Sequence, residues 1–246
     1  EGAIAWLNYA DRLYQLPLGV VGVALGSVLL PKLSEKIQLD NSSEMHNVVN
    51  HALKIAAILI FPATAALIIL PVPIITVLFE RGEFSIIDSK NTASALSIYA
   101  TGLPAFVLHK IFTPIFFSKG DTKTPFRIAV FSMLANIILA ISLIGHFEFL
   151  APVLSTSISS WIMAFALYHK SKKLGFYFDW KLIKEIIMIL VSTIILSLVL
   201  ILAQKEWFYL LTTNNFSLFY LIILISASSS IYFLTLWFFG ILNKNK

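Results

Sequence analysis

The chain has 246 residues, of which 58% are hydrophobic and 13% are charged, and its formal net charge is +5 at pH 7. Soluble domains need about a quarter of their residues to be charged, and here the apolar residues gather into runs long enough to cross a bilayer. This composition excludes an ordinary soluble domain and predicts an all-α integral membrane protein, because continuous apolar runs do not fit a β-barrel. The absence of cysteine excludes thiolate chemistry.

Seven segments are each long enough to span the hydrocarbon core as a helix, which predicts a polytopic helical bundle. The second contains Pro62, Pro71 and Pro73, so we expect it to be kinked or broken near its far end. The fifth carries hydroxyl side chains, which usually bond the backbone of their own helix, with a ligand role as the alternative. The segments run at roughly 3–31, 52–79, 92–118, 126–145, 149–169, 183–203 and 216–241.

The first segment holds an adjacent acid and base, Asp11 and Arg12, in a run otherwise fit to cross a membrane. At 1.5 Å per residue, Arg12 is expected roughly 13 Å inside the hydrocarbon region. A charge at that depth costs about 2.5–3.5 kcal/mol even on lenient insertion scales, so the pair predicts a polar cavity. The alternative is that the two charges neutralise each other or lie at a shallower depth.

The same segment continues with Pro17, Gly19, Gly22 and Gly26, which leave one face almost bare of side chains. The spacing of Gly22 and Gly26 lets two membrane helices approach closely. Pro17 frees a backbone carbonyl one turn earlier and permits a bend. We therefore expect close helix packing and a hinge in this stretch.

The third segment contains a second cation, Lys110, which lies nine residues before Lys119 and hence roughly 13 Å from that face of the membrane. Because Arg12 and Lys110 approach the middle from opposite faces, the two cations are expected to line one cavity, with Asp11 as the acid at that depth. The alternative for Lys110 is that its long stem carries the ammonium to an interface.

The charges of the connecting loops predict the orientation, because basic residues are retained on the cytoplasmic side. One set of connections, with the C-terminal tail, holds thirteen basic residues, whereas the other holds Arg81, Lys90 and Lys205. The C-terminus is therefore expected in the cytoplasm and residue 1 on the outer side. The thirteen are Lys32, Lys36, Lys54, Lys119, Lys123, Arg127, Lys170, Lys172, Lys173, Lys181, Lys184, Lys244 and Lys246.

Motifs of catalysis and metal binding are not found in the sequence. The five histidines are scattered without the spacing of a metal site, and GVVGVALG lies inside an apolar helix rather than after a strand. The stretch from Ser85 to Asp88 is typical of a helix start. We expect no catalytic residue, metal, cofactor or nucleic-acid partner, and the chain is not expected to be an enzyme.

Three stretches carry a resemblance to a known family: AWLNYADRLYQLPLGVVGVALGSVLLPKLS, LFERGEF followed by Asp88, and SKGDTKTPFRIA. Their order and spacing resemble those of the MurJ/MviN family of lipid II flippases, over essentially the whole chain. The resemblance implies a MOP-exporter-like fold of fourteen membrane helices, of which this chain is similar to helices eight to fourteen. Since it begins at Glu1, without Met and directly before a spanning helix, a fragment without its N-terminal lobe is expected.

The family resemblance also implies a function. Such proteins move lipid II, an undecaprenyl-pyrophosphate-linked peptidoglycan precursor, from the inner to the outer leaflet of the bacterial inner membrane by alternating access, for cell-wall biosynthesis. The implied partners are lipid II, membrane lipids and the missing N-terminal lobe, and a half chain is expected to be inactive alone. Residues 1–169 are implied to form the C-terminal transport lobe, and 183–241 two additional helices that form a groove for the lipid tail.

The resemblance assigns roles to individual residues as well. Arg12 matches a cavity arginine of the family and is expected to bind the pyrophosphate, with Lys110 as a point charge and Asp11 orienting Arg12 or changing protonation. Some members have a polar pair four residues apart, proposed as a cation site, on the helix spanning 126–145. This chain has Asn136 but Ala140, a remnant of that site at most, so a sodium-coupled cycle is not expected.

Three alternatives remain open at this point. The first is a related MOP-superfamily exporter of drugs or of another polyprenyl-linked glycan, which the missing first lobe would distinguish. The second is a membrane-embedded transferase that uses Glu80, Glu83 or Asp88 as its catalytic acid. The third is a structural scaffold without transport activity.

Overall fold

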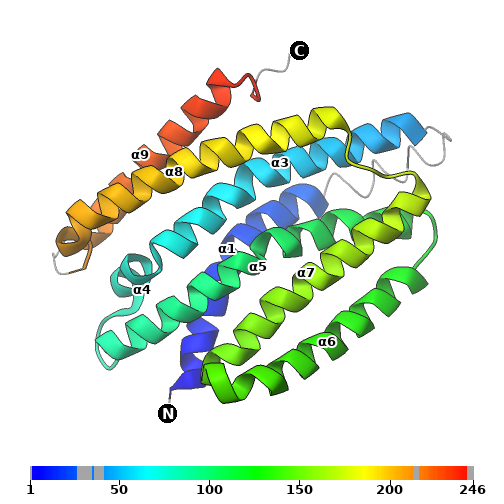
Figure 1. Ribbon diagram of the computed structural model, residues 1–246. Helices are drawn as coiled ribbons and strands as arrows, with labels where there is room; N and C mark the ends of the chain where they lie inside the picture. Colours follow the sequence, from blue (N-terminus) through cyan, green and yellow to red (C-terminus); the bar gives the residue numbers. More distant parts are fainter. Residues whose placement is uncertain (1, 27–34, 36–41, 213–215, 243–246) are drawn as a thin grey trace.

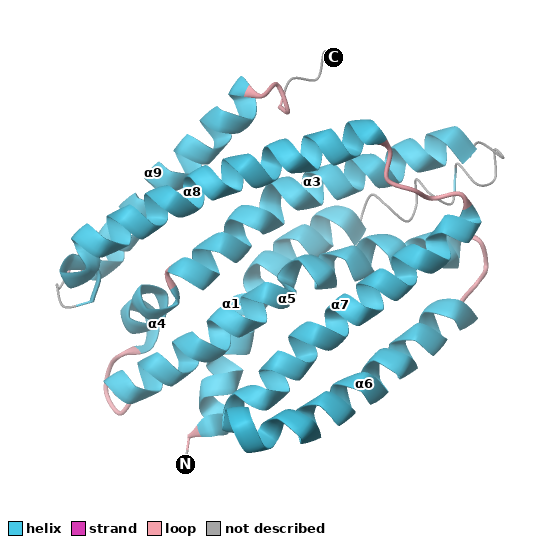
Figure 2. Ribbon diagram, viewed as in Figure 1, coloured by secondary structure: helices cyan, strands magenta, loops and turns pink. Residues whose placement is uncertain are grey.

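The computed structural model describes residues 2–26, 35, 42–212 and 216–242, and these residues form helices and short connections without a strand (Figures 1 and 2). Two single-turn 3-10 helices, η1 (Glu148–Leu150) and η2 (Lys172–Leu174), flank α7. The α-helices are α1 (Ala3–Gly26), α3 (Ser42–Ile69), α4 (Pro71–Phe79), α5 (Ile86–Ser118), α6 (Lys123–Phe147), α7 (Ala151–Ser171), α8 (Trp180–Thr212) and α9 (Ser217–Phe238).

Five stretches of the described chain are long and apolar enough to cross a membrane: Glu44–Ile69, Ile86–Ser118, Lys123–Leu174, Trp180–Trp207 and Ser217–Phe238. The longest joins α6 and α7, which turn back on each other at η1 and lie side by side in Figure 1. α1 is not among the five, because the polar residues Asp11, Arg12 and Gln15 lie in the middle of its described length. A polytopic all-helical membrane bundle is thus confirmed.

The second predicted segment is broken where the prolines indicated. α3 ends at Ile69 and α4 begins at Pro71, whereas Pro62 lies within α3 without ending it. Proline has no N–H to donate and disfavours the helical conformation of the residue before it, here Leu70, so the chain starts a new helix at this point.

Several helices are longer than the apolar pattern predicted. α3 starts at Ser42 rather than near residue 52, because its polar first turns extend beyond the apolar run and pack beside α8. α5 starts at Ile86 rather than 92, because Ser85 and Asp88 form a capping box. The Ser85 N–H donates to Asp88 Oδ2 (2.8 Å), and the Asp88 N–H donates to Ser85 Oγ (3.3 Å), which satisfies two N–H groups at the helix start. The far end of the predicted 3–31 segment lies outside the described residues.

α5 is the central helix of the bundle. It packs against α1, α3, α4 and α7, while α6 lies outside α7 and the α8–α9 pair lies on the far side of α3 (Figure 1). Its side chains Leu96, Leu103, Ile111 and Ile115 are fully buried. Because so much of α5 is enclosed, the positions of its few exposed polar residues are set by the packing around it.

The hydroxyl cluster of α7 has a packing role. Ser155 and Thr156 donate to the carbonyl of Pro152, as is usual for hydroxyls within a helix. Ser157 instead donates to the carbonyl of Ile98 on α5 (3.0 Å). The prediction that these hydroxyls bond their own helix is confirmed for the first two, and Ser157 also ties α7 to α5.

The α8–α9 pair is joined to the rest of the bundle through α3. Lys54 Nζ forms an ion pair with Glu185 Oε1 (2.8 Å), and Asn50 Nδ2 donates to Asp179 Oδ2 (3.1 Å) just before α8. On α9, the Tyr232 hydroxyl donates to the carbonyl of Ile58 (2.9 Å). These polar contacts fix the pair at the side of α3 that faces away from α1.

Candidate functional site

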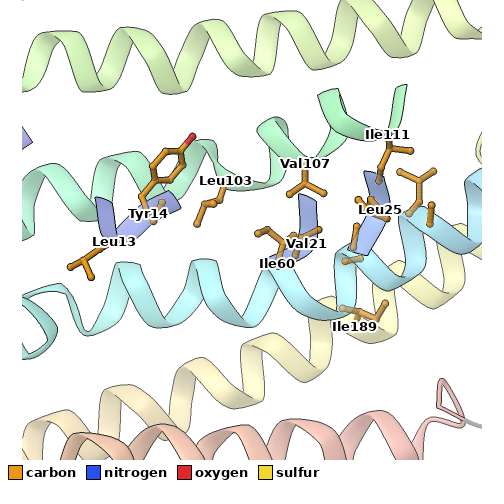
Figure 3. Packing of buried hydrophobic residues seen from close by; sticks show 14 of the residues in the cluster. Leu13, Tyr14, Val21, Leu25, Ile60, Leu103, Val107, Ile111 and Ile189 are labelled. Carbon is orange, nitrogen blue, oxygen red and sulfur yellow. The ribbon is translucent and has the colours of Figure 1, made fainter. Parts of the chain in front are cut away.

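One face of α1 points away from the described bundle. Asn8, Arg12, Gln15 and Gly19 are exposed at intervals of three or four residues, which places them on one side of the helix. The opposite side packs into the core, where Leu13, Tyr14, Val21 and Leu25 are buried (Figure 3). α1 therefore presents a polar, partly side-chain-free face, which is flanked by the exposed apolar side chains Leu16, Val20 and Val23.

α1 and α5 run in the same direction, as three contacts along their length show. Trp6 Nε1 donates to Asp88 Oδ1 (2.6 Å), and the rings of Tyr14 and Tyr99 stack with centroids 5.3 Å apart. Further along, the Lys110 side chain lies against Gly22. Successive positions along α1 thus contact successive positions along α5. This register fixes how far apart Arg12 and Lys110 lie along the helix axes.

The predicted acid and base of α1 point to different surroundings. Arg12 is exposed, whereas Asp11 is half-buried and accepts a hydrogen bond from Gln15 Nε2 one turn later. Successive helical residues are rotated by about 100°, so Asp11 and Arg12 do not face each other. Within the described parts of the chain, no ion pair joins them, and the Arg12 guanidinium is available for a ligand.

Lys110 is exposed, and its stem crosses α1 at Gly22. A Cβ atom at Gly22 would lie 3.2 Å from Lys110 Cδ and 3.3 Å from Cε, and closer still to Nζ. The near neighbour of Gly22 is therefore a lysine side chain, whereas the sequence predicted the backbone of another helix. The following glycine, Gly26, is the last described residue of α1.

The other two residues of the predicted packing and hinge stretch differ in their surroundings. Gly19 has no atom within 4 Å of the position a Cβ would take, so it faces open space. Pro17 lies inside α1, which remains helical on both sides of it. A hinge at Pro17 stays a prediction.

Asn136 faces the neighbouring helix. Its Nδ2 lies 3.5 Å from Thr156 Oγ1 on α7, and Thr156 in turn bonds the carbonyl of Pro152. Sequence reasoning missed Thr156 as the neighbour, because twenty positions separate the two residues and only the α6–α7 hairpin brings them together. In the residues that the structure describes, no group of three His, Asp or Glu side chains is arranged to hold a metal.

Two acids at the end of the bundle where α4 joins α5 have structural partners. Asp88 bonds Trp6 and Ser85, and Glu80 accepts from Thr76 Oγ1 (3.0 Å). A cavity of about 540 Å³ lies here, beside Trp6, Tyr9, Phe84, Arg81 and Glu83. The bonds of Asp88 and Glu80 serve helix capping and packing, which is the ordinary function of such residues.

Comparison with known proteins decides the family. The family model described as "Lipid II flippase MurJ" matches residues 1–241. The chain belongs to the MurJ family. The "Probable lipid II flippase MurJ" of Rickettsia prowazekii (strain Madrid E) is 42% identical over 173 residues, which are 70% of this chain and 34% of that protein. The corresponding MurJ protein of Rhizobium tropici is 39% identical over 198 residues, 80% of this chain and 37% of that protein.

A solved MurJ structure agrees with the fold. It is titled "Lipid II flippase MurJ, inward closed conformation", and it superposes with a TM-score of 0.76 at 29% sequence identity. The match covers 96% of this chain and 48% of that one. The chain thus spans about half of the solved MurJ protein and about a third of the curated relatives named above.

Proposed function

We propose that this chain is the C-terminal half of a transporter that flips lipid II, the polyprenyl-diphosphate-linked peptidoglycan precursor, from the inner to the outer leaflet. The observation that carries the proposal is the exposed polar face of α1, with Arg12 on it and Lys110 beside it, in a membrane bundle of the MurJ family. A diphosphate and its sugar-peptide head must cross hydrocarbon, and a cationic surface lowers that cost.

In this proposal the face of α1 lines a cavity shared with an N-terminal lobe. The guanidinium of Arg12 binds the diphosphate through two parallel charge-assisted hydrogen bonds. Asp11, which accepts a hydrogen bond from Gln15, sets the local hydrogen-bond pattern of this part of the cavity. Rocking of the two lobes then exposes the cavity to one side of the membrane at a time.

The two last helices have a different role in the proposal. Residues 1–169 form the transport lobe, and 183–241 form a groove that holds the prenyl tail in lipid. Many exposed side chains of α8 and α9 are apolar, among them Ile194, Leu198, Phe219 and Ile222, which suits contact with a hydrocarbon chain. The contacts of α3 with Glu185 and Tyr232 attach this pair to the lobe.

The proposed location is the bacterial inner membrane, with the C-terminus in the cytoplasm. Support comes from the basic residues Lys119, Lys123, Lys170 and Lys184, which lie at the ends of α5, α6, α7 and α8 that meet at one end of the bundle (Figure 1). Four others of the thirteen, Lys32, Lys36, Lys244 and Lys246, lie outside the described residues.

The test is complementation in cells depleted of their own flippase, with the full-length protein that carries this half. We expect rescue by the parent and loss of rescue with Arg12→Ala at equal membrane levels. Arg81→Ala is the matched control, since it removes an exposed cation from an outer loop. A parent that is well expressed but does not rescue would favour an exporter of another substrate. Rescue by Arg12→Ala would remove Arg12 from the substrate path.

A further inference from the structure

The two cations beside the polar face of α1 lie at different levels. Ten residues separate Arg12 from Gly22, against which the Lys110 ammonium lies, and this corresponds to about 15 Å along the helix. Helical side chains lean toward the N-terminus of their helix, so Arg12 leans away from Lys110. The sequence predicted one cavity with both cations near mid-membrane, and the helix register separates them by almost three turns.

Lys110 is held in place by the packing around it. Its neighbours on α5, Val107 and Ile111, are buried against α1, where Val21 and Leu25 are buried on either side of Gly22 (Figure 3). The backbone on both sides of the contact is therefore fixed. The absence of a side chain at Gly22 leaves the space that the lysine stem and ammonium occupy.

We propose that Lys110 is a second anion-binding point, separate from Arg12, and that Gly22 is its positioning residue. The inference rests on the proposed function and specifies how the headgroup is recognised. The two phosphoryl groups of a diphosphate share one bridging oxygen, so they lie too close together to reach both cations. Both are therefore placed at Arg12. The group at Lys110 is then a carboxylate of the peptide part, which suits an ammonium acting as a point charge.

Gly19 and Gly22 give the span between the two cations its shape. Gly19 lies on the side of α1 that carries Arg12, Gly22 lies about a quarter turn around the helix toward α5, and a Cβ at Gly19 would meet no atom within 4 Å. A sugar between the diphosphate and the peptide can therefore lie close to the α1 backbone. Two anionic groups at the two ends of an uncharged sugar match the charge pattern of this surface.

The test measures binding of two compounds to the purified full-length protein in lipid nanodiscs: the complete lipid-linked glycopeptide, and the prenyl diphosphate without sugar or peptide. Lys110→Ala is expected to weaken binding of the glycopeptide roughly tenfold and to leave the prenyl diphosphate within about twofold. Arg12→Ala is expected to weaken both compounds. Lys110→Arg, which keeps the charge, is expected to restore most of the glycopeptide affinity.

Gly22→Ala tests the positioning role, with Gly145→Ala on α6, where a Cβ would meet nothing within 4 Å, as its control. Gly22→Ala is expected to reproduce the selective loss, with no further loss when combined with Lys110→Ala, because the two changes remove the same interaction. Gly145→Ala is expected to bind both compounds like the parent.

Four results would overturn the inference. Equal weakening of both compounds by Lys110→Ala would place Lys110 at the diphosphate. If Lys110→Ala binds the glycopeptide like the parent, Lys110 is not a second anion-binding point. If Gly22→Ala does so, Gly22 does not position Lys110. A parent that binds neither compound would instead overturn the proposed function, and this inference with it.

Discussion

The indole of Trp6 donates its Nε1–H to Asp88 Oδ1 at 2.6 Å, across 82 positions of the sequence. Asp88 is also the third residue of the capping box that starts α5. The same Trp6 ring packs edge-on against Phe149 of η1, with centroids 5.1 Å apart. One side chain of α1 thus joins the start of α5 and the turn of the α6–α7 hairpin.

We expect Asp88→Ala to lower the midpoint of thermal unfolding of the detergent-solubilised protein, because it removes the N-cap interaction of α5 and leaves the Trp6 N–H without its acceptor. Asp88→Asn, which keeps an acceptor oxygen, should lower the midpoint of thermal unfolding less than Asp88→Ala does. Glu83→Ala is the control, an exposed acid in the turn just before α5. An Asp88→Ala protein as stable as Glu83→Ala would show that this junction does not contribute to stability.

Gly102 lies at a close approach of α5 and α7. A Cβ there would lie 3.2 Å from the Cα of Ser157 and 3.3 Å from Ser160 Oγ. Gly102→Ala should therefore force the two helices apart and cost about 1–3 kcal/mol. The control is Gly145→Ala on α6, where a Cβ would meet nothing within 4 Å. Reversible unfolding of both variants measures the difference, and equal stabilities would contradict the predicted clash.

Asp121 lies in the loop between α5 and α6, and hydrogen bonds from Thr124 hold the pKa of its carboxyl below the ordinary value of 3.8. A carboxyl whose pKa is lowered by folding stabilises the folded state above its unfolded pKa and loses this contribution as the pH falls through the folded pKa. We expect the parent to be more stable than Asp121→Asn near pH 7, with the difference beginning to shrink near pH 3.8 and disappearing as the pH falls through the lower pKa of the folded state. Thermal unfolding of both proteins across this range measures it, and a difference that persists at low pH would have another cause.

We expect transport to be independent of sodium. Asn136 and Thr156 offer neutral oxygens, and Ala140, one turn from Asn136, supplies no carboxylate, whereas hard cations are held mainly by carboxylate oxygens. Flipping by the reconstituted full-length protein should be the same when sodium is replaced by potassium. A clear loss without sodium would show that the Asn136–Thr156 pair still binds the ion.

Several features of this protein followed from the sequence alone. Apolar runs of helical length predict a membrane bundle, since in hydrocarbon the backbone must satisfy its own hydrogen bonds. The break at Pro71 and the helix start at Ser85 are local, because a missing N–H and a capping side chain act within one turn. Arg12, Asp11 and Lys110 stood out by the same reasoning, because charges are rare in such runs.

Only the tertiary structure decided what those residues meet. The rotation of α1 directs Arg12 outward, and the parallel register of α1 and α5 brings Lys110 onto Gly22 instead of to the level of Arg12. Likewise, Thr156 came to lie beside Asn136 through the α6–α7 hairpin. Local pattern fixes where a helix begins and how apolar it is, but side-chain packing between helices sets their rotation and register, and these decide which charges lie together.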